Sequence, residues 1–350
     1  MISSILKWVL LMASGGLLIV ALSPSIQSLL NRHGLIPDQY SYGDLYNITN
    51  LRAFREDNFN ANTSLTDADK PRKRYTDVNL YTIGDSFTDI DTSYYAGGRN
   101  VHVWVGESPA VETVLDKTKK NILVLEFIER VLQERLRYTG NDNIYIKNGL
   151  VTPDHYHIPT KTEAEQNEET GWMLARFGHD INQRLEFLLF NNWPFRWFKE
   201  AKARLLLDGF GRVPGAVISQ DKQHLFYQPE IDTAYNLSAF RPITKPKLDA
   251  LVTNLNSIRQ YYLQMGFDEV YVCLIPNKVT VLDPTYGVYN HQIERIEANP
   301  RLQAPILSMI DTLRQYPGWY HLGDGHWNKQ GKRFWLRRVN QVAASWSCQH

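Results

Sequence analysis

The pattern of apolar and polar residues predicts that strands and helices alternate along most of the chain. Apolar runs of strand length end at turn residues, whereas longer segments repeat their apolar residues at helical spacing. Strands that alternate with helices form βαβ units, so the pattern predicts an α/β fold on a parallel central sheet. Strands are expected at residues 78–83, 101–105, 122–127 and 269–275, a hairpin at 216–227, and helices at 109–118, directly after 127, 246–266, 305–315 and 331–346.

Residues 140–215 break this alternation, and we interpret them as a helical insertion that forms a cap or rim. Two apolar-rich helices are expected in it, at residues 181–190 and 196–207. Exposed aromatic rings there would stack on sugar rings. Packing of the insertion onto the core is the favoured interpretation, because aromatic side chains dominate protein cores. The aromatic residues concerned are Trp193, Phe195, Trp197 and Phe198.

The N-terminus contains an apolar run from Trp8 to Leu22, with Lys7 as the one charge before Arg32. A bilayer core needs about 20 apolar residues, and a secretory signal needs a shorter run with small residues at the cut. Residues 1–23 are therefore expected to be a signal anchor or a cleaved signal peptide. Either one places the remainder outside the cytoplasm. A buried core helix is disfavoured because the run has no polar face.

Residues 24–75 are polar with little regular pattern, and we interpret them as a membrane-proximal connector that partly packs on the domain. The domain itself is expected to span residues 76–345. The chain of 350 residues has a net charge of +1, which argues against a nucleic-acid partner. Cys273 lies in an apolar run and Cys348 in the polar tail, so no disulfide between them is expected.

Two short segments carry residues suited to nucleophilic catalysis. Ser86 follows the first predicted strand, and Asp324 and His326 lie in a Gly-rich turn before the last predicted helix. A serine hydroxyl needs a histidine base within reach, and that histidine needs an orienting carboxylate. Ligand sites of parallel sheets lie beyond the carboxyl ends of the strands, where Ser86 is expected. Each segment alone also fits an ordinary turn, but together they predict a Ser–His–Asp triad.

Other polar clusters give weaker signals. His155 and His157 have spacing that can hold a metal, with Asp154 beside them, but no third ligand is evident nearby. A polar loop is the favoured interpretation there. Asp85 stands in a group of aspartates that lacks the spacing of a calcium loop, and it is expected to stabilise the serine turn. We therefore predict no metal and no cofactor.

The serine segment Gly84-Asp85-Ser86-Phe87 resembles the first block of the SGNH (GDSL) hydrolase superfamily, and Asp324-Gly325-His326 resembles its last block. The resemblance covers residues 76–345 and implies a three-layer α/β fold with Ser86, His326 and Asp324 as catalytic residues. It also implies that Gly106, after the second predicted strand, offers its backbone N–H to an oxyanion.

Two features depart from the usual SGNH pattern. One residue instead of two separates Asp324 from His326, and no asparagine follows the third predicted strand. Arg130, which lies near that position, is either a substitute oxyanion donor or a structural partner of Glu126 or Glu129. The structural interpretation is slightly favoured.

The sequence Asp-x-His-Trp is similar to the motif of alginate O-acetyltransferase-like proteins, which acetylate exported polysaccharides. Residues 217–227 and the segment Ile275-Pro276-Asn277-Lys278 also resemble that group. In that group the Asp–His block usually precedes the serine block, whereas here the serine block comes first, as in ordinary SGNH enzymes. The chain therefore looks like a circularly permuted relative of that group. Trp327, beside the base, is expected either to shape the acceptor site or to pack under its loop.

These resemblances imply serine-dependent acetyl transfer to a cell-envelope or exported polysaccharide through an acyl-enzyme. The acyl donor would come from a membrane acyltransferase, and the N-terminal segment would hold the enzyme at the membrane. A carbohydrate esterase would use the same triad. A third hypothesis is a non-catalytic, envelope-anchored assembly protein that binds glycan.

Overall fold

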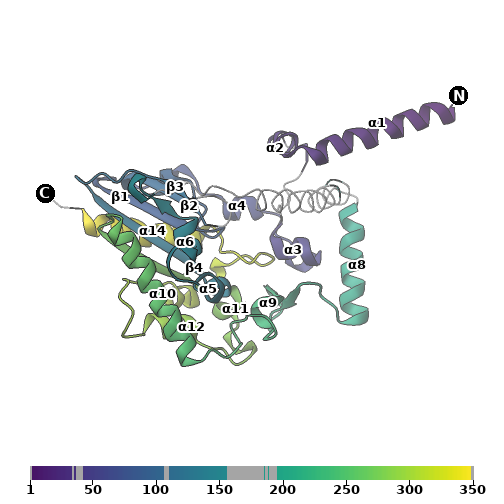
Figure 1. Cartoon of the computed structure of the whole chain (residues 1–350). Helices are drawn as coiled ribbons and strands as arrows, with labels where there is room; N and C mark the ends of the chain where they lie inside the picture. The colour runs from purple at the N-terminus through teal and green to yellow at the C-terminus, as the bar shows by residue number, and fades with distance from the viewer. Residues whose placement is uncertain are drawn as a thin grey trace, which may run out of the picture.

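The computed structural model describes residues 2–33, 35–36, 42–105, 110–155, 185, 188 and 195–347. Its centre is a four-stranded sheet in the order β2–β1–β4–β8, in which every neighbouring pair is parallel (Figure 1). The predicted α/β class with a parallel central sheet is therefore confirmed. The strands are β1 (Tyr75–Gly84), β2 (Gly97–Trp104), β4 (Lys120–Ile128) and β8 (Glu269–Ile275).

Long helices cover both faces of this sheet. Tyr81 and Ile83 of β1 point to the face where α10 (Lys245–Gln264) packs, and they share a buried cluster with Leu255. The alternate residue Leu80 points to the other face, into a cluster with Trp335 of α14 (Lys329–Trp346). Side chains of a strand alternate between faces, so a central strand buried on both sides reads as a continuous apolar run.

The two covering helices begin and end where the sequence supplies the required residues. Thr244 caps α10 by accepting a hydrogen bond from the N–H of Lys247, and Gly266, at φ 105°, follows the end of the helix. The side chain of Asn328 caps α14 by accepting from the N–H of Gln330 at 2.9 Å. Both helices match the predicted ranges within a few residues.

Two short sheets lie beside the central one. The predicted hairpin is confirmed as the antiparallel pair β6 (Ala216–Ile218) and β7 (Leu225–Tyr227). A small parallel pair joins β3 (Val111–Glu112) to β5 (Leu150–Val151). The remaining helices of six or fewer residues in the domain are α6 (Ile144–Lys147), α9 (Gln228–Ile231), α11 (Lys278–Leu282), α12 (Gln292–Glu297) and α13 (Ile310–Gln315); α5 (Glu129–Arg135) follows β4 as predicted.

Two predicted helices are wrong in whole or in part. Residues 110–118 contain the strand β3 and no helix, because Val111 and Thr113 donate their backbone N–H groups across to β5 and its flank. The helix predicted at 305–315 begins only at Ile310. The segment before it pairs with the edge of the sheet, where Ile306 forms a parallel bridge with Val272 of β8.

Residues 24–75 contain more regular structure than the sequence predicted. The segment forms α2 (Pro24–Arg32), α3 (Asp44–Thr49), the 3-10 turn η1 (Arg52–Phe54) and α4 (Phe59–Thr63). Its packing on the domain is confirmed, because Leu45, Leu51 and Phe54 share a buried cluster with Ala216 and Leu225 of the hairpin.

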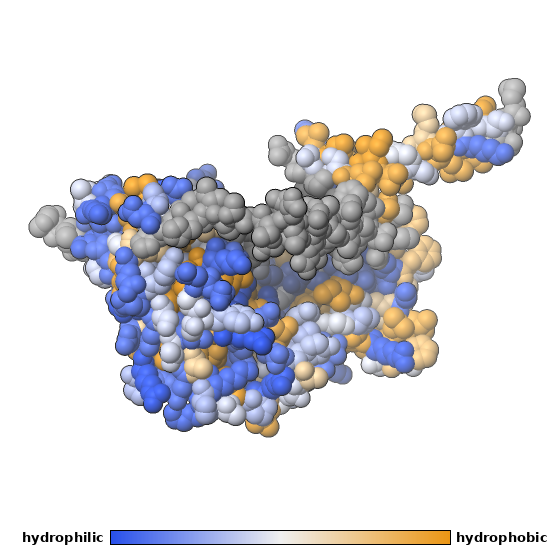
Figure 2. Space-filling view, in the orientation of Figure 1, coloured by the Kyte–Doolittle hydropathy of each residue, from blue (hydrophilic) through white to orange (hydrophobic). Residues whose placement is uncertain are grey.

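The N-terminal helix α1 (Ile2–Leu22) extends away from the body of the molecule (Figure 1). Residues Ser4–Leu22 are long and apolar enough to cross a membrane, with a mean hydropathy of 2.2, and 6% of that stretch is buried. A signal sequence passes the same test. The apolar side chains of α1 are exposed, and Figure 2 shows apolar residues along it, whereas a helix that is apolar all round is otherwise buried in a core.

About half of the predicted insertion at 140–215 lies outside the described residues, including Trp193, His157 and the helix expected at 181–190 apart from residues 185 and 188. Cys348 lies outside them too, whereas Cys273 is buried and free. The second predicted helix is confirmed as α8 (Phe195–Phe210). The favoured packing of its aromatics onto the core is wrong for Trp197 and Phe198, which are 58% and 61% exposed.

Cavity-creating substitutions on the two faces of the sheet test this architecture. Leu255→Ala on α10 and Leu336→Ala on α14 remove side chains from separate buried clusters. Each is expected to lower the free energy of unfolding by about 2–5 kcal/mol. Val288→Ala is the control, because that side chain is 87% exposed. Thermal unfolding followed by tryptophan fluorescence measures all three, and a loss on one face only would contradict the two-sided core.

Candidate active site

The turn that carries Ser86 follows directly from the carboxyl end of β1. The N–H of Thr88 donates to the carbonyl of Asp85 at 3.0 Å and closes the turn. Glu126, a buried side chain near the end of β4, accepts from the N–H of Asp85 at 2.8 Å and from the Thr88 hydroxyl at 3.2 Å. A Cβ at Gly84 would lie 2.1 Å from Thr88 Oγ1 and 2.6 Å from Glu126, so glycine is required there.

Asp85 stabilises the same turn, as the sequence predicted. Its carboxylate accepts from the N–H of Phe87 at 3.2 Å and forms an ion pair with Arg135 at 3.1 Å. Within the described part of the chain, the N–H of Ser86 itself makes no hydrogen bond. That N–H is therefore available to a ligand bound beside the serine hydroxyl.

The structure brings Ser86, His326 and Asp324 together, although Ser86 is separated from His326 by 240 positions. Ser86 Oγ lies 2.8 Å from His326 Nε2, and His326 Nδ1 lies 2.7 Å from Asp324 Oδ1. An ionised carboxylate only accepts hydrogen bonds, so Nδ1 carries the hydrogen and Nε2 can accept the serine proton. The order hydroxyl, imidazole, carboxylate is the one that a general base on serine requires.

The electrostatics of the pair favour a charged imidazolium. Burial alone lowers the pKa of His326, but the charge and hydrogen bond of Asp324 outweigh it and raise that pKa above its ordinary value of 6.5. Burial also opposes ionisation of Asp324, yet His326 and two backbone N–H donors hold its pKa well below the usual range. Asp324 therefore remains a carboxylate and stabilises the proton that His326 accepts.

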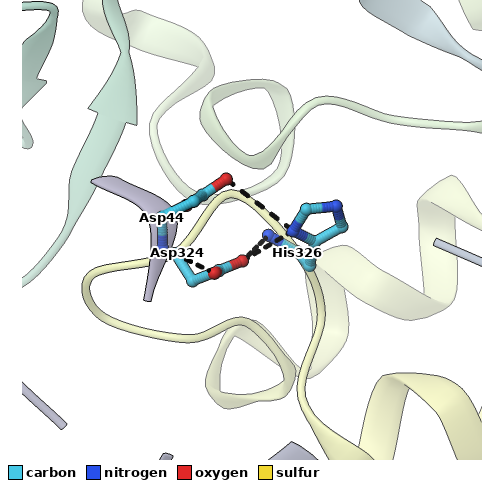
Figure 3. Close-up of side chains that lie close together, drawn as sticks. All are labelled: Asp44, Asp324 and His326. Carbon is cyan, nitrogen blue, oxygen red and sulfur yellow. Dashed lines mark hydrogen bonds and ion pairs between the residues drawn. The ribbon is translucent and has the colours of Figure 1, made fainter. Parts of the chain in front are cut away.

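A second carboxylate, Asp44 at the start of α3, completes the surroundings of the imidazole (Figure 3). Its N–H donates to Asp324 Oδ2 at 2.8 Å, and its own carboxylate accepts from the N–H of Gly325 at 2.8 Å. Asp44 Oδ2 lies 3.8 Å from His326 Nδ1. Burial, together with the charge of Asp324, raises the pKa of Asp44 to about 6. Residues 24–75, which the sequence predicted to be a connector, thus hold the carboxylate of Asp324 in place through Asp44.

Glu56 attaches a further part of this segment to the same loop. It accepts from His321 Nδ1 at 2.6 Å and from the N–H of Leu322 at 3.1 Å. The other ring nitrogen of His321 contacts Thr63 Oγ1 at 3.1 Å, and Phe59 packs against the ring at 4.5 Å. Residues 56–63 therefore hold the start of the loop while Asp44 holds its middle.

Lys278 supports the loop from beneath. The side chain is 1% exposed, and its ammonium group donates to the carbonyl oxygens of Leu225, Leu322 and Asp324 at 2.9, 2.9 and 3.1 Å. An ammonium group has three hydrogens, so each one is used. Burial lowers the pKa of Lys278 to about 8. The residue joins the exit of β8 and the hairpin strand β7 to the loop that carries Asp324.

Three further residues were predicted to lie in the site: Trp327, Arg130 and Gly106. Trp327 is fully buried under the loop, donates its indole N–H to the carbonyl of Phe87 at 3.0 Å, and also lines the cavity beside Ser86. Arg130 pairs with Glu230 at 2.9 Å, which corrects the predicted partners Glu126 and Glu129. Those two carboxylates are instead bonded to the serine turn and to Thr280. Gly106 lies outside the described residues.

A cavity of about 440 Å³ opens over the serine and the histidine. Ser86 and His326 lie on its wall, and Phe59, Trp104 and Lys332 line the space around them. Pockets of about 300–1,000 Å³ take ligands of small-molecule size. The aromatic walls and the one ammonium group suit an acyl group or a sugar ring next to an oxygen-rich substituent.

The same three groups, Asp44, Asp324 and His326, present ligand atoms within 4.8 Å of one another and so also resemble a metal site. All of these ligand atoms except Asp44 Oδ2 are already engaged in hydrogen bonds. Both oxygens of Asp324 and one of Asp44 accept from N–H groups, and Nδ1 of His326 contacts Asp324. The arrangement is therefore better described as a hydrogen-bonded network that orients the imidazole.

Comparisons of the chain with protein-family models, curated proteins and solved structures find no match. Sequence reasoning missed Asp44, Glu56, Glu126 and Lys278. A signal existed for Glu126, because a carboxylate inside the apolar run 122–128 requires a buried partner. No pattern marked Asp44 or Glu56.

The titration of His326 tests this network without any assumption about a substrate. In side-chain NMR of histidine-labelled protein, the midpoint for His326 is expected above 6.5, because Asp324 and Asp44 both favour the imidazolium. Asp44→Asn keeps a hydrogen-bond acceptor but removes a charge, so the midpoint should move to lower pH. The exposed Asp311→Asn is the control. An unchanged midpoint in Asp44→Asn would show that Asp44 does not act on the imidazole.

Proposed function

We propose that the protein is a serine-dependent acyltransferase that moves an acetyl group to a hydroxyl of a cell-envelope or exported polysaccharide. The observation that carries this proposal is the connected row of Ser86, His326 and Asp324, with separations of 2.8 and 2.7 Å, on the wall of a cavity. Nucleophile, base and orienting acid in this order support acyl transfer through a covalent intermediate.

In the first half-reaction, Ser86 Oγ attacks the carbonyl carbon of an ester donor while its proton passes to His326 Nε2. The tetrahedral oxyanion then collapses, the bond to the leaving alcohol breaks, and Nε2 returns the proton to the departing oxygen. The acyl group stays on Ser86 as an ester. Asp324 keeps the imidazole in the tautomer that each proton transfer needs.

In the second half-reaction, a sugar hydroxyl loses its proton to Nε2 and attacks the acyl carbonyl. Ser86 Oγ leaves as the bond breaks and regains the proton, so the enzyme is restored. Water in place of the sugar makes the same site a carbohydrate esterase. The choice between the two depends on how well the cavity binds a sugar beside Ser86.

The oxyanion that forms in both halves needs nearby N–H donors. The N–H of Ser86 is free to serve, as described above. The resemblance of the sequence to SGNH hydrolases offers Gly106 as the second donor. Arg130 is the weaker candidate because its guanidinium group is bonded to the buried carboxylate of Glu230. We extend the proposal to a three-layer SGNH-like fold, with the serine block and the Asp–His block in permuted order relative to alginate O-acetyltransferase-like proteins.

The polysaccharide acceptor rests on the likeness of the Asp-x-His-Trp motif to alginate O-acetyltransferase-like proteins. The placement outside the cytoplasm rests on α1, which we propose to be a membrane anchor or signal segment. An anchored enzyme at that location can receive acyl groups from a membrane acyltransferase.

Acetyl transfer from p-nitrophenyl acetate tests the proposed roles. Ser86→Ala and His326→Ala are each expected to lower the rate of p-nitrophenol release by at least about 10³-fold, since triad residues act as a unit. Ser257→Ala, on the exposed side of α10, should keep the wild-type rate. The full-length chain in detergent is the sample, and circular dichroism checks that each variant is folded.

Oligosaccharide acceptors then separate transfer from hydrolysis. Acetyl groups recovered on the sugar support the transferase, and free acetate alone supports the esterase. A rate that survives in Ser86→Ala would contradict the proposed nucleophile. Folded wild-type protein with neither turnover nor an acetyl burst, but with bound glycan, would support the non-catalytic alternative instead.

A further inference from the structure

The outer face of α8 is apolar although it is exposed. Trp197, Phe198 and Leu205 are 58%, 61% and 64% exposed. Helical spacing places Phe198 and Leu205 opposite the buried Glu200 and Ala203, with Trp197 at the flank of this face. Lys202 and Arg204 are exposed among them, and Arg204 pairs with Asp208 at 3.1 Å. A helix with Trp, Phe and Leu on one face and flanking basic residues is typical of helices that lie in a membrane interface.

The inner face of α8 is firmly attached to the domain, so the outer face is presented in a fixed direction. Glu200, which is buried, accepts from the Tyr46 hydroxyl at 2.8 Å and from Arg55 at 2.5 Å. Ala203 packs in the cluster of the hairpin and Phe54. The exposure of the aromatics is thus a property of a packed helix and not of a loose one.

The position of α1 indicates what covers this face. Ala21, near the end of α1, packs against Leu185 and Leu188, which lie shortly before α8 in the chain. In Figure 1, α1 points away from the body and α8 runs crosswise to it at the same side of the molecule. Figure 2 shows apolar residues on both helices. A bilayer crossed by α1 would therefore meet α8 lying along its surface.

Charge near α8 favours a surface with anionic lipids. A cavity of about 650 Å³ lies between η1 and α8, with Leu51, Trp197 and Leu207 as apolar walls. Arg52 and Arg204 line it together with Glu200 and Asp208, and these two carboxylates pair with Arg55 and Arg204. The apolar walls suit a lipid chain, and the excess of basic residues in α8, four (Arg196, Lys199, Lys202 and Arg204) against the two acidic Glu200 and Asp208, favours a phosphate-bearing headgroup.

We propose that α8 docks in the interface of the bilayer that α1 spans, with anionic phospholipid as its partner. This inference rests on the anchoring role proposed for α1 and not on the chemistry at Ser86. Docking would also fix the distance between the membrane and the cavity over Ser86, because Tyr46 links α8 to the loop of Asp324. Tyr46 bonds to Glu200 of α8 through its hydroxyl and to the carbonyl of Gly323, in the loop of Asp324, through its N–H at 2.8 Å.

Site-directed fluorescence in vesicles tests the proposal. The full-length chain with Cys348→Ser, in which Cys273 is buried, is reconstituted into vesicles of phosphatidylcholine and phosphatidylglycerol. Single cysteines introduced by Leu205→Cys, Val288→Cys or Ser14→Cys carry an environment-sensitive label. Lipids with brominated acyl chains should quench the fluorescence of the label at position 205, as expected for an interfacial helix. Aqueous iodide should quench that label about 3-fold less than the label at position 288.

The position in α1 separates the two ways of failing. If brominated lipid quenches the label at position 14 while iodide quenches the label at position 205, docking of α8 is overturned and the anchoring role of α1 stands. Both labels open to iodide would overturn the anchor as well. Label 205 shielded from iodide but insensitive to brominated lipid would mean that protein covers α8, which also contradicts the proposal.

A charge reversal provides the matched test of the lipid class. Lys202→Glu on α8 should reduce quenching of label 205 by brominated lipid in the anionic vesicles, whereas Lys117→Glu, an exposed lysine outside α8, should not. Equal quenching in both variants, or equal quenching in vesicles without phosphatidylglycerol, would overturn the role of anionic lipid.

Discussion

The hydrogen bond from His326 Nδ1 to Asp324 Oδ1 is the interaction on which the arrangement of the site depends. It selects the imidazole tautomer, and the tautomer decides whether Nε2 can take a proton from Ser86. The carboxylate of Asp324 lies only two residues before His326. It can bond to the imidazole ring only if the turn between the two residues is held in one conformation. Asp44 and Glu56 of the segment 24–75, and Lys278 after β8, supply that restraint.

This restraint is costly, because it places charged groups in buried surroundings. Lys278 and Asp324 are 1% and 4% exposed, and Glu126 is fully buried beneath the serine turn. Burial raises the pKa of Glu126 well above its ordinary value. Buried polar networks of this kind specify a single conformation when their members are satisfied, and they are often found at functional sites. The parallel sheet makes the network possible, since β1, β4 and β8 all end at the same edge.

Much of the core could be predicted from the sequence because the strands are short apolar runs with turn residues behind them. The long helices α10 and α14 were also predictable from apolar periodicity and capping residues. Ser86, Asp324 and His326 could be singled out because their side chains have complementary chemistry. Their separation in space could not be derived, since it depends on how strand ends and the final loop meet.

The contribution of residues 24–75 was hidden for a physical reason. Asp44 and Glu56 stand in a polar segment without long periodic runs, and they act on a loop about 270 positions away through bonds to N–H groups and a histidine ring. Local pattern carries no information about such contacts. The failed helix at 109–118 has a similar origin, because pairing with β5 decided the conformation of Val111 and its neighbours.

Covalent chemistry at Ser86 is the central claim, and peptide mapping by mass spectrometry after rapid acid quench tests it most directly. Wild-type protein mixed with an activated acetyl ester is predicted to carry one acetyl group on the peptide that contains Ser86. His326→Ala is predicted to carry none, because without the base the hydroxyl is a weak nucleophile. Acetylation of Ser86 to the same extent in both proteins, or only at other residues, would contradict the account.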